Sequence, residues 1–343
     1  MEKEKVVLPK FNVETYLKDG DAVIDKLKDV EAAANKIHDK GYENIFLLGM
    51  GGTYDELEPI QYIMNKYSEV EVHLSNAAEL NVLGNKRLNK KSIVITASAS
   101  GDTKEIVEAV EWIVKEGIDV MAFTKPETPL GKLATMIVTA PVTTGQCEYS
   151  YLMFDVLALR LLNRRGEFPK YDDFVAQTKN IFHDLVGIRE KFDERADEIA
   201  KQYALAPYSI FVGSGALWGE TVLFSMCILE EMQWVRTRAV SSPDFFHGTL
   251  ELVEKDVITL KQMVEKMCLN PAKILGLDRG TLQKGHPADV IIVDTEQEYA
   301  IDKNKFVSKG HNTPFDGWKV KGKVLYTICD GKIVFKNQEE KES

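Results

Sequence analysis

The sequence predicts an α/β protein in three layers, with a doubly wound parallel sheet, a second α/β unit that is cut short, and a small, mostly β C-terminal segment. Three observations lead to this fold class. Short apolar runs alternate with helix-length amphipathic segments in the first part of the chain, which is typical of a parallel sheet. The same plan restarts after Pro207, and the pattern changes again after Val257.

Length and charge limit the function classes. The chain has 343 residues, which is enough for two domains. Its net charge of −10 argues against nucleic acid or an anionic membrane as a partner, because both need a basic surface. The N-terminus lacks the apolar core of a signal peptide, and no run approaches the roughly 20 apolar residues of a membrane helix. We therefore expect a cytoplasmic protein.

The first unit is expected to span residues 1–204 and to contain five strands and two long helices. The strand-like runs lie near residues 44–49, 69–74, 92–97, 118–124 and 135–140. Helix-length segments separate the first four runs, so helices should cover both faces of the sheet. The two helical patterns that follow cover about 148–164 and 171–204, and the second is rich in charge, which predicts a half-exposed helix.

Two of these runs end in loops that suit an anion. After 92–97 comes SASGDT, which brings the hydroxyls of Ser98, Ser100 and Thr103 in front of a helix over 104–115. The N-terminal amides and the positive dipole end of such a helix attract a phosphate. A structural interpretation stays open, in which Ser100 or Thr103 caps the helix without any ligand.

The second loop is GMGGT, which follows the run at 44–49. Gly51 and Gly52 would let the backbone approach a ligand closely, and Thr53 adds a hydroxyl. The loop lacks the Gly-Lys-Ser/Thr of a nucleotide-binding P-loop and the glycine spacing of a dinucleotide fold. Two such loops on neighbouring strands predict a site for a compact phosphorylated metabolite.

The second α/β unit is expected over 205–256. A strand at 209–212 enters Gly-Ser-Gly, a helix continues to about Met232, and another strand-like run follows at 235–240. No further strand and helix pairs follow before the pattern changes. The unit therefore looks unfinished.

The last segment, 257–343, reads as a short helix followed by antiparallel strands. The helix is expected at 259–268 and a turn at Asn270-Pro271. Strands are expected at 288–293, 318–320, 324–328 and 332–335, and Asp330-Gly331 is a hairpin turn signal.

Candidates for proton transfer lie in the second α/β unit, expected over 205–256. Glu230 and Glu231 end a helix beside Trp234, and His247 follows sixteen positions after Glu231. A carboxylate among apolar side chains suits a general base, and a histidine can transfer protons near neutral pH. From the residues alone, the favoured interpretation of Glu231 is a solvated helix carboxylate, and that of His247 is a structural histidine. Glu230 is the natural control for Glu231.

A metal centre or a disulfide framework is not indicated. The four cysteines are scattered without a C-x-x-C pair, and we expect them to be small buried side chains. None of the six histidines lies two positions from another, so the H-x-H pair of metal-dependent amidohydrolases is missing.

Residues 1–256 resemble the sugar isomerase (SIS) domain family, most closely the bacterial fructosamine 6-phosphate deglycases of the fructoselysine and glucoselysine type. The motifs that carry the resemblance are GMGGT at 49–53, SASGDT at 98–103, FSMCILEEMQW at 224–234 and FFHGTLEL at 245–252. The choice of a deglycase over a sugar-phosphate isomerase depends mainly on the last two.

The resemblance implies a role for each matching residue. Thr53, Ser98, Ser100 and Thr103 would hold the sugar phosphate, together with the backbone at Gly51 and Gly52. Glu231 would be the general base and His247 the general acid. In this family the histidine is often contributed across a dimer interface, so a homodimer with its site at the interface is implied. The reaction would convert fructoselysine or glucoselysine 6-phosphate to a hexose 6-phosphate and a free amine, with no metal or organic cofactor.

Residues 258–337 resemble a different family, and match the C-terminal tail of a bacterial dihydroorotase. The matching motifs are TLKQMVEKM at 259–267, NPAKILGL at 270–277 and NTPFDGWKVKG at 312–322. In those enzymes the tail carries none of the metal ligands, so dihydroorotase activity is not expected here.

The two resemblances together indicate a chimera joined near 256 and 257. Gene fusion, recombination and an assembly error remain open as its origin. A sugar-phosphate isomerase, a non-catalytic phosphosugar-binding module and an inactive chimera therefore stand beside the deglycase as alternatives. We expect lowered stability, because an incomplete parallel sheet exposes apolar faces and an unpaired edge.

Overall fold

The computed structural model describes residues 11–249, 260–274, 276–306, 313 and 315–337. The chain divides into two compact units, Met1–His247 and Gly248–Ser343. The predicted junction near 256 and 257 and residues 250–252 of the last SIS-like motif lie outside the described residues. The division into 1–204, 205–256 and 257–343 remains a prediction.

A five-stranded parallel sheet with the order β2-β1-β3-β4-β5 forms the centre of the first unit. Its strands are β1 (Asn44–Gly49), β2 (Glu71–Asn76), β3 (Ser92–Ala97), β4 (Asp119–Phe123) and β5 (Met136–Val138). All six residues of β1 and of β3 are buried, which explains why both strands are continuous apolar runs in the sequence. The predicted doubly wound parallel sheet is confirmed.

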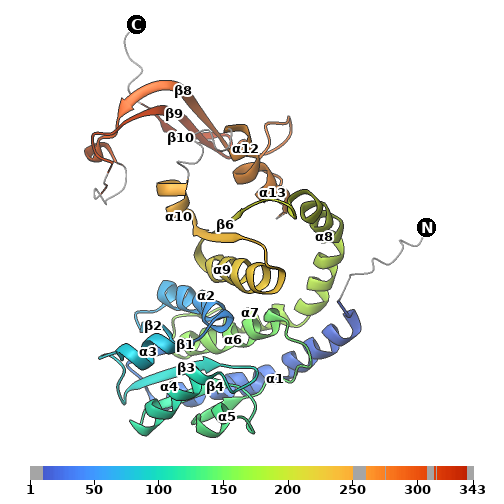
Figure 1. Ribbon diagram of the computed structural model, residues 1–343, viewed down its shortest axis with the longest axis vertical. Helices are drawn as coiled ribbons and strands as arrows, with labels where there is room; N and C mark the ends of the chain where they lie inside the picture. The colour runs from blue at the N-terminus through green and yellow to red at the C-terminus, as the bar shows by residue number, and fades with distance from the viewer. Residues whose placement is uncertain (1–10, 250–259, 275, 307–312, 314, 338–343) are drawn as a thin grey trace, which may run out of the picture. The chain divides into compact units, whose positions relative to one another are not determined.

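Helices cover both faces of this sheet (Figure 1). On one face α1 (Val13–Lys40), α2 (Gly52–Tyr67) and α6 (Cys147–Arg164) enclose a core that contains Leu47 and Ile95. On the other face α3 (Ala77–Leu83), α4 (Lys104–Lys115) and α5 (Pro129–Leu133) pack on Phe46 and Val94. Successive strand residues thus supply two separate cores, as the period of two in a strand requires.

The long charged pattern at 171–204 forms two helices instead of one. They are α7 (Tyr171–Thr178) and α8 (Ile181–Tyr203). Only Phe182 and Val186 are buried in α8, so the predicted exposure of this segment is confirmed.

The remainder of the first unit repeats the strand, helix and strand order only once. β6 (Ser209–Gly213) and β7 (Thr237–Ser241) form a two-stranded parallel sheet. Between them lie α9 (Trp218–Leu223) and the π-helical segment η2 (Phe224–Glu231). Among the described residues no third strand joins this sheet, as expected for a unit that is cut short.

Helix α9 packs on α2 (Figure 1). Gly219 makes this close approach possible, because a Cβ atom there would lie only 2.2 Å from the carbonyl oxygen of Asp55. The second α/β unit is thus anchored on the helix that begins at the GMGGT loop.

The second compact unit, Gly248–Ser343, consists of short helices and a three-stranded antiparallel sheet of order β10-β9-β8. The sheet contains β8 (Val290–Ala300), β9 (Lys319–Cys329) and β10 (Lys332–Lys336). The two runs expected at 318–320 and 324–328 are one strand, β9. Asp330 and Gly331 both have positive φ, 48° and 74°, and form the predicted hairpin turn.

Two local expectations are wrong. Asn270 and Pro271 begin the helix α13 (Asn270–Ile274) instead of forming a turn, because a proline is tolerated in the first turn of a helix. Cys268 and Cys329 are exposed, and Cys147 and Cys227 are half-buried. Cys329 ends β9, directly before the hairpin turn.

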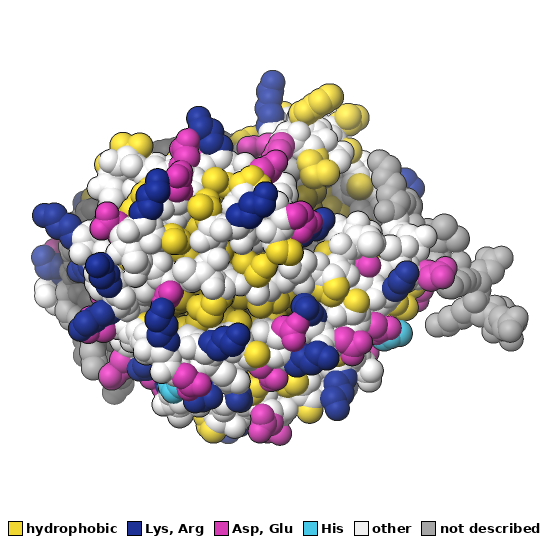
Figure 2. All heavy atoms as spheres, turned by 90° about the horizontal axis from the view of Figure 1, so that it is seen from below, with side chains coloured by type: hydrophobic (Ala, Val, Ile, Leu, Met, Phe, Trp, Pro, Cys, Tyr) yellow, Lys and Arg dark blue, Asp and Glu magenta, His cyan; other side chains and the backbone are white. Residues whose placement is uncertain are grey.

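The surface carries charges of both signs. Figure 2 shows Lys and Arg side chains interspersed with Asp and Glu over one face of the molecule.

Candidate functional site

The candidate site lies where the strand order of the large sheet reverses. β1 pairs with β2 on one side and with β3 on the other, and the chain leaves β1 and β3 for helices on opposite faces. In doubly wound sheets a crevice opens at this switch point, outside the carboxyl ends of the strands. The two loops singled out in the sequence, 49–53 and 98–103, follow these two strands.

The hydroxyls of the SASGDT loop gather around Ser98. Its buried Oγ lies 3.0 Å from Oγ1 of Thr103 and 3.5 Å from Oγ of Ser100, and it accepts a hydrogen bond from the backbone N–H of Gly101 at 3.0 Å. Gly101 has φ +68°, and a Cβ atom there would lie 2.3 Å from Oγ1 of Thr128, so the turn requires glycine.

The hydroxyls of this loop do not cap α4. Thr103 occupies the N-cap position, but its side chain makes no capping hydrogen bond. The N-terminal amides of this twelve-residue helix are therefore left to another acceptor.

The GMGGT loop leads into α2 in a similar way. Gly51 is the N-cap residue and offers no side chain to cap α2. The backbone N–H of Gly52 bonds Sγ of Cys227, and those of Tyr54 and Asp55 bond the carbonyl oxygen of Gly51. Thr53 lies in the first turn and lines a cavity of about 390 Å³.

The cavity lies at the carboxyl ends of the strands and has a mixed polar lining. Ala97 and Ala99, on either side of Ser98, belong to its wall, whereas Ser98, Ser100 and Thr103 do not line it. Its polar and charged walls come from Thr53, Glu56, Thr124, Lys125, Thr139, Thr143, Thr144, Gln146 and Ser150.

Asp19 of α1 holds the loop that forms one wall. Its carboxylate accepts hydrogen bonds from the backbone N–H groups of Thr143 and Thr144, at 2.8 and 3.0 Å, and from both hydroxyls. Burial opposes its ionisation, but these bonds outweigh burial and lower its pKa. Asp19 was not singled out in the sequence, where it is one of many charged residues in α1.

Glu56 is a second residue that sequence reasoning missed. It lies one helical turn after Thr53 on α2, and both side chains line the cavity. Burial, together with the carboxylates of Glu220 and Asp55, raises its pKa to about 7. The signal that could have found it is the i, i+3 spacing from Thr53, which places both side chains on one face of the helix.

Further acidic groups lie beside Glu56. Burial and the neighbouring carboxylates of Glu58 and Glu220 raise the pKa of Asp55 to about 7. Glu220 on α9 accepts a hydrogen bond of 2.6 Å from the hydroxyl of Tyr151 on α6. This end of α2 is therefore strongly acidic.

Cys227, four residues before Glu231, lies against the GMGGT loop. A Cβ atom at Gly52 would lie 3.6 Å from Sγ of Cys227, so η2 packs against the start of α2. Burial raises the pKa of the Cys227 thiol, and so do the carboxylates of Asp55, Glu231 and Glu56 in decreasing order. Glu231 itself is exposed at the end of η2.

Glu230, the control for Glu231, has a structural role. Its Oε1 accepts hydrogen bonds from Oγ1 of Thr237 at 2.9 Å and from the backbone N–H of Thr237 at 3.2 Å. It therefore joins the end of η2 to the first residue of β7.

His247 lies in the π-helical segment η3 (Phe245–Thr249), and its side chain is exposed. The neighbouring Phe245 is buried and fixes the start of this segment. The pairing of Glu231 with His247 at one site remains a prediction.

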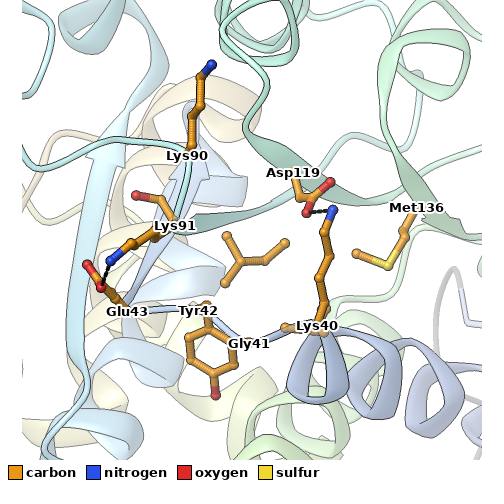
Figure 3. A pocket seen from close by; sticks show the side chains of 11 residues that line it. Lys40, Gly41, Tyr42, Glu43, Lys90, Lys91, Asp119 and Met136 are labelled. Carbon is orange, nitrogen blue, oxygen red and sulfur yellow. Dashed lines mark hydrogen bonds and ion pairs between the residues drawn. The ribbon is translucent and has the colours of Figure 1, made fainter.

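A second cavity, of about 320 Å³, lies at the amino ends of the strands (Figure 3). Its charged side chains are largely paired, Lys40 with Asp119 and Lys91 with Glu43. These pairs neutralise each other, and this end of a parallel sheet is not where ligands usually bind. The cavity at the carboxyl ends is the better candidate.

In the part of the chain that the structure describes, no three His, Cys, Asp or Glu side chains come together as a metal site would require. None of the described helices combines the length and apolar character needed to cross a membrane.

Known structures share the fold of most of the chain. A Bacillus subtilis protein provisionally assigned as a phosphosugar isomerase is 25% identical, with a TM-score of 0.61, over 67% of this chain and 72% of that one. The C-terminal domain of glucosamine-fructose-6-phosphate aminotransferase from Francisella tularensis is 17% identical, with a TM-score of 0.60, over 70% of this chain and 72% of that one. The predicted SIS fold is confirmed.

The C-terminal part matches a different group of proteins. The amidohydrolase family model matches residues 225–334, and a dihydroorotase from Geobacter metallireducens is 50% identical over 88 residues. This match covers 26% of this chain and 21% of the dihydroorotase, so the chain spans about a fifth of the length of that relative. These findings are consistent with the predicted chimera. The family match begins within η2, upstream of the predicted junction.

Proposed function

We propose that the chain binds a sugar phosphate at the switch point of its parallel sheet and acts as a fructosamine 6-phosphate deglycase. The observation that carries this proposal is the pair of hydroxyl loops at two helix starts that have no side-chain cap, beside a polar cavity. Backbone amides and hydroxyls bind phosphate without a basic surface, which suits a chain of net charge −10.

The phosphate would lie against the SASGDT loop and the start of α2. Ser98, Ser100 and Thr103 would donate hydrogen bonds from their hydroxyls. Thr53, with the backbone at Gly51 and Gly52, would contact the opposite side of the phosphate. The rest of the substrate would extend into the cavity that Thr53 and Glu56 line. The 25% identity to a provisionally assigned phosphosugar isomerase supports a phosphorylated sugar as the ligand.

The proposed chemistry consists of proton transfers followed by hydrolysis. The open-chain substrate carries a secondary amine on C1 and a carbonyl at C2, and His247 assists ring opening. Glu231 takes a proton from C1 while the C2 oxygen gains one, which gives an enaminol. A proton then returns to C2 and the N–H proton is lost, which leaves a neutral imine between C1 and nitrogen. Water adds to C1, and the amine leaves as a hexose 6-phosphate forms.

A homodimer is part of this proposal. Glu231 and His247 are both exposed within the first unit. A partner subunit that covers this surface would exclude water from the site and contribute a histidine to it. The exposed position of Glu231 supports this requirement, because a general base works best in a partly desolvated environment.

The test is release of glucose 6-phosphate from fructoselysine 6-phosphate and glucoselysine 6-phosphate by the purified chain. Glu231→Gln should lower turnover about a hundredfold or more, the contribution typical of a general base. Glu230→Gln is the matched control: it should keep turnover and lower the unfolding temperature, because Glu230 holds Thr237. Equal turnover in wild type and Glu231→Gln would remove Glu231 from the mechanism.

A phosphosugar-binding module is the second candidate, and the two-stranded second sheet favours it. A folded chain that binds glucose 6-phosphate, releases no amine and interconverts no sugar phosphates would select this candidate. Interconversion of fructose 6-phosphate and glucose 6-phosphate would select an isomerase instead. A folded chain that binds none of these compounds would be an inactive chimera.

A further inference from the structure

One wall of the cavity carries an acidic side chain that no cationic side chain pairs with among the described residues. Glu56 is half-buried and lines the cavity from the same face of α2 as Thr53. Among the described residues, no Lys, Arg or His forms an ion pair with Glu56, Asp55 or Glu220. Lys125 lines the same cavity but makes no ion pair with Glu56 within the described part of the chain.

The group next to Glu56 has an unused acceptor. Asp55 is only 4% exposed, and its Oδ2 is buried without a hydrogen-bond partner in the structure. Its charge and that of Glu220 act directly on Glu56. A buried carboxylate group without a partner is costly, and a cation nearby would offset this cost.

The direction of α2 relates this wall to the phosphate end of the site. Thr53 lies in the first turn, and Glu56 lies one turn further along the same face. A ligand that placed its phosphate at the helix start would therefore extend past Glu56. The cavity thus offers hydrogen-bond donors at one end and the carboxyl group of Glu56 beyond them.

We propose that Glu56 binds the protonated secondary amine at C1 of the substrate and selects amine-bearing sugar phosphates over those with a hydroxyl at C1. This inference rests on the proposed function, because it identifies the part of the substrate that the cavity wall recognises. A carboxylate and an ammonium form a charge-assisted hydrogen bond, whereas a hydroxyl offers no charge to balance.

The test compares two ligands that differ only at C1, 1-amino-1-deoxyfructose 6-phosphate and fructose 6-phosphate. Their affinities are measured by calorimetry with the full chain. The wild type should bind the amine at least about tenfold more tightly, and Glu56→Gln should abolish this preference while it keeps the affinity for fructose 6-phosphate. Glu58→Gln is the matched control, because Glu58 is half-buried on the same helix but does not line the cavity.

Each outcome separates this inference from the proposed function. A preference that survives in Glu56→Gln, or one that Glu58→Gln also abolishes, overturns the role of Glu56 even if the wild type releases amine. A preference that only Glu56→Gln abolishes supports the inference even if no amine is released. A wild type that binds both ligands equally overturns the inference alone.

Discussion

At the scale of single residues, the acidic groups on α2 make stability depend on pH. Burial, with nearby carboxylates, raises the pKa values of Asp55 and Glu56 from 3.8 and 4.5 to about 7. Between these values the folded state holds protons that the unfolded chain has lost, so the free energy of unfolding falls as pH rises from about 4.5 to 7. Burial also raises the pKa of Asp155 on α6 to about 6, which acts in the same direction.

We therefore predict a higher urea midpoint at pH 5 than at pH 8, measured by circular dichroism. Glu56→Gln should reduce the difference between the two pH values, because the amide does not ionise. A midpoint that rises with pH, or an identical pH dependence in Glu56→Gln, would contradict the burial of these charges.

The pKa of Asp19 is shifted in the opposite direction, and its carboxylate positions a loop of the site. Its lowered pKa means that its contribution to stability is present above the unfolded value of 3.8 and is lost as pH falls through the folded value. Asp19→Asn should lower the unfolding temperature and raise the KM for a sugar phosphate more than it lowers kcat, because the loop at Thr143 and Thr144 would loosen. Asp25→Asn, an exposed change on the same helix, should alter neither. Unchanged KM in a folded Asp19→Asn variant would show that the loop does not shape the site.

The sequence could predict the hydroxyls of the site but not its acidic wall. Ser98 and Thr53 follow buried strands, and residues at the carboxyl ends of parallel strands meet at one edge of the sheet. Glu56 follows no strand directly, and an acidic residue near the start of a helix usually reflects the helix dipole alone. Its significance depends on Glu220, which reaches it from a helix more than 150 positions later in the chain.

At the scale of elements, β3 provides a serine at each end for comparison. Ser98 follows its carboxyl end and gathers the hydroxyl loop, whereas Ser92 begins the strand and accepts a hydrogen bond from the backbone N–H of Asn89. Both side chains are buried. Ser98→Ala should weaken glucose 6-phosphate binding about tenfold, the value of one hydrogen bond to a charged group. Ser92→Ala should lower only the unfolding temperature, and equal loss of binding in both variants would exclude the loop as the phosphate site.

The elements that the sequence predicts best are those buried on both faces. β1 and β3 match the expected ranges, because a continuous apolar run leaves little choice of register. The π-helical segments, the break between α7 and α8, and the helix at Asn270 were not predicted. Each of these depends on tertiary contacts, since hydrophobic periodicity alone does not distinguish a π-helical turn from an α-helical one.

At the scale of the whole molecule, the two units differ in the size of their cores. The first unit buries apolar side chains on both faces of its sheet. Among the described hydrophobic residues of the second unit, Ala272 alone is buried. Amide hydrogens in β8, β9 and β10 should therefore exchange with solvent much faster than those in β1 and β3. Equal protection of both sheets, measured by mass spectrometry, would contradict this difference.

The two-stranded sheet of β6 and β7 exposes features that favour association between chains. β6 and β7 pair with each other alone among the described strands, and several large apolar side chains around them are exposed, among them Val212, Leu217, Phe224 and Trp234. Trp234 is 88% exposed and has φ +57°, which is unfavourable for an aromatic residue. Unpaired strand edges and exposed apolar side chains favour contact between chains.

Two forms of association have different signatures in light scattering after size-exclusion chromatography. A dimer closes by symmetry and stops at twice the mass of the chain, whereas pairing along open edges continues with concentration. We predict growth beyond the dimer at high concentration, because the short parallel sheet leaves edges that a symmetric dimer does not use up. Trp234→Gly should reduce this growth without loss of stability, since glycine accepts the positive φ and exposes no aromatic ring. A mass that stays at the dimer, in wild type as in Trp234→Gly, would contradict this growth and agree with a closed dimer instead.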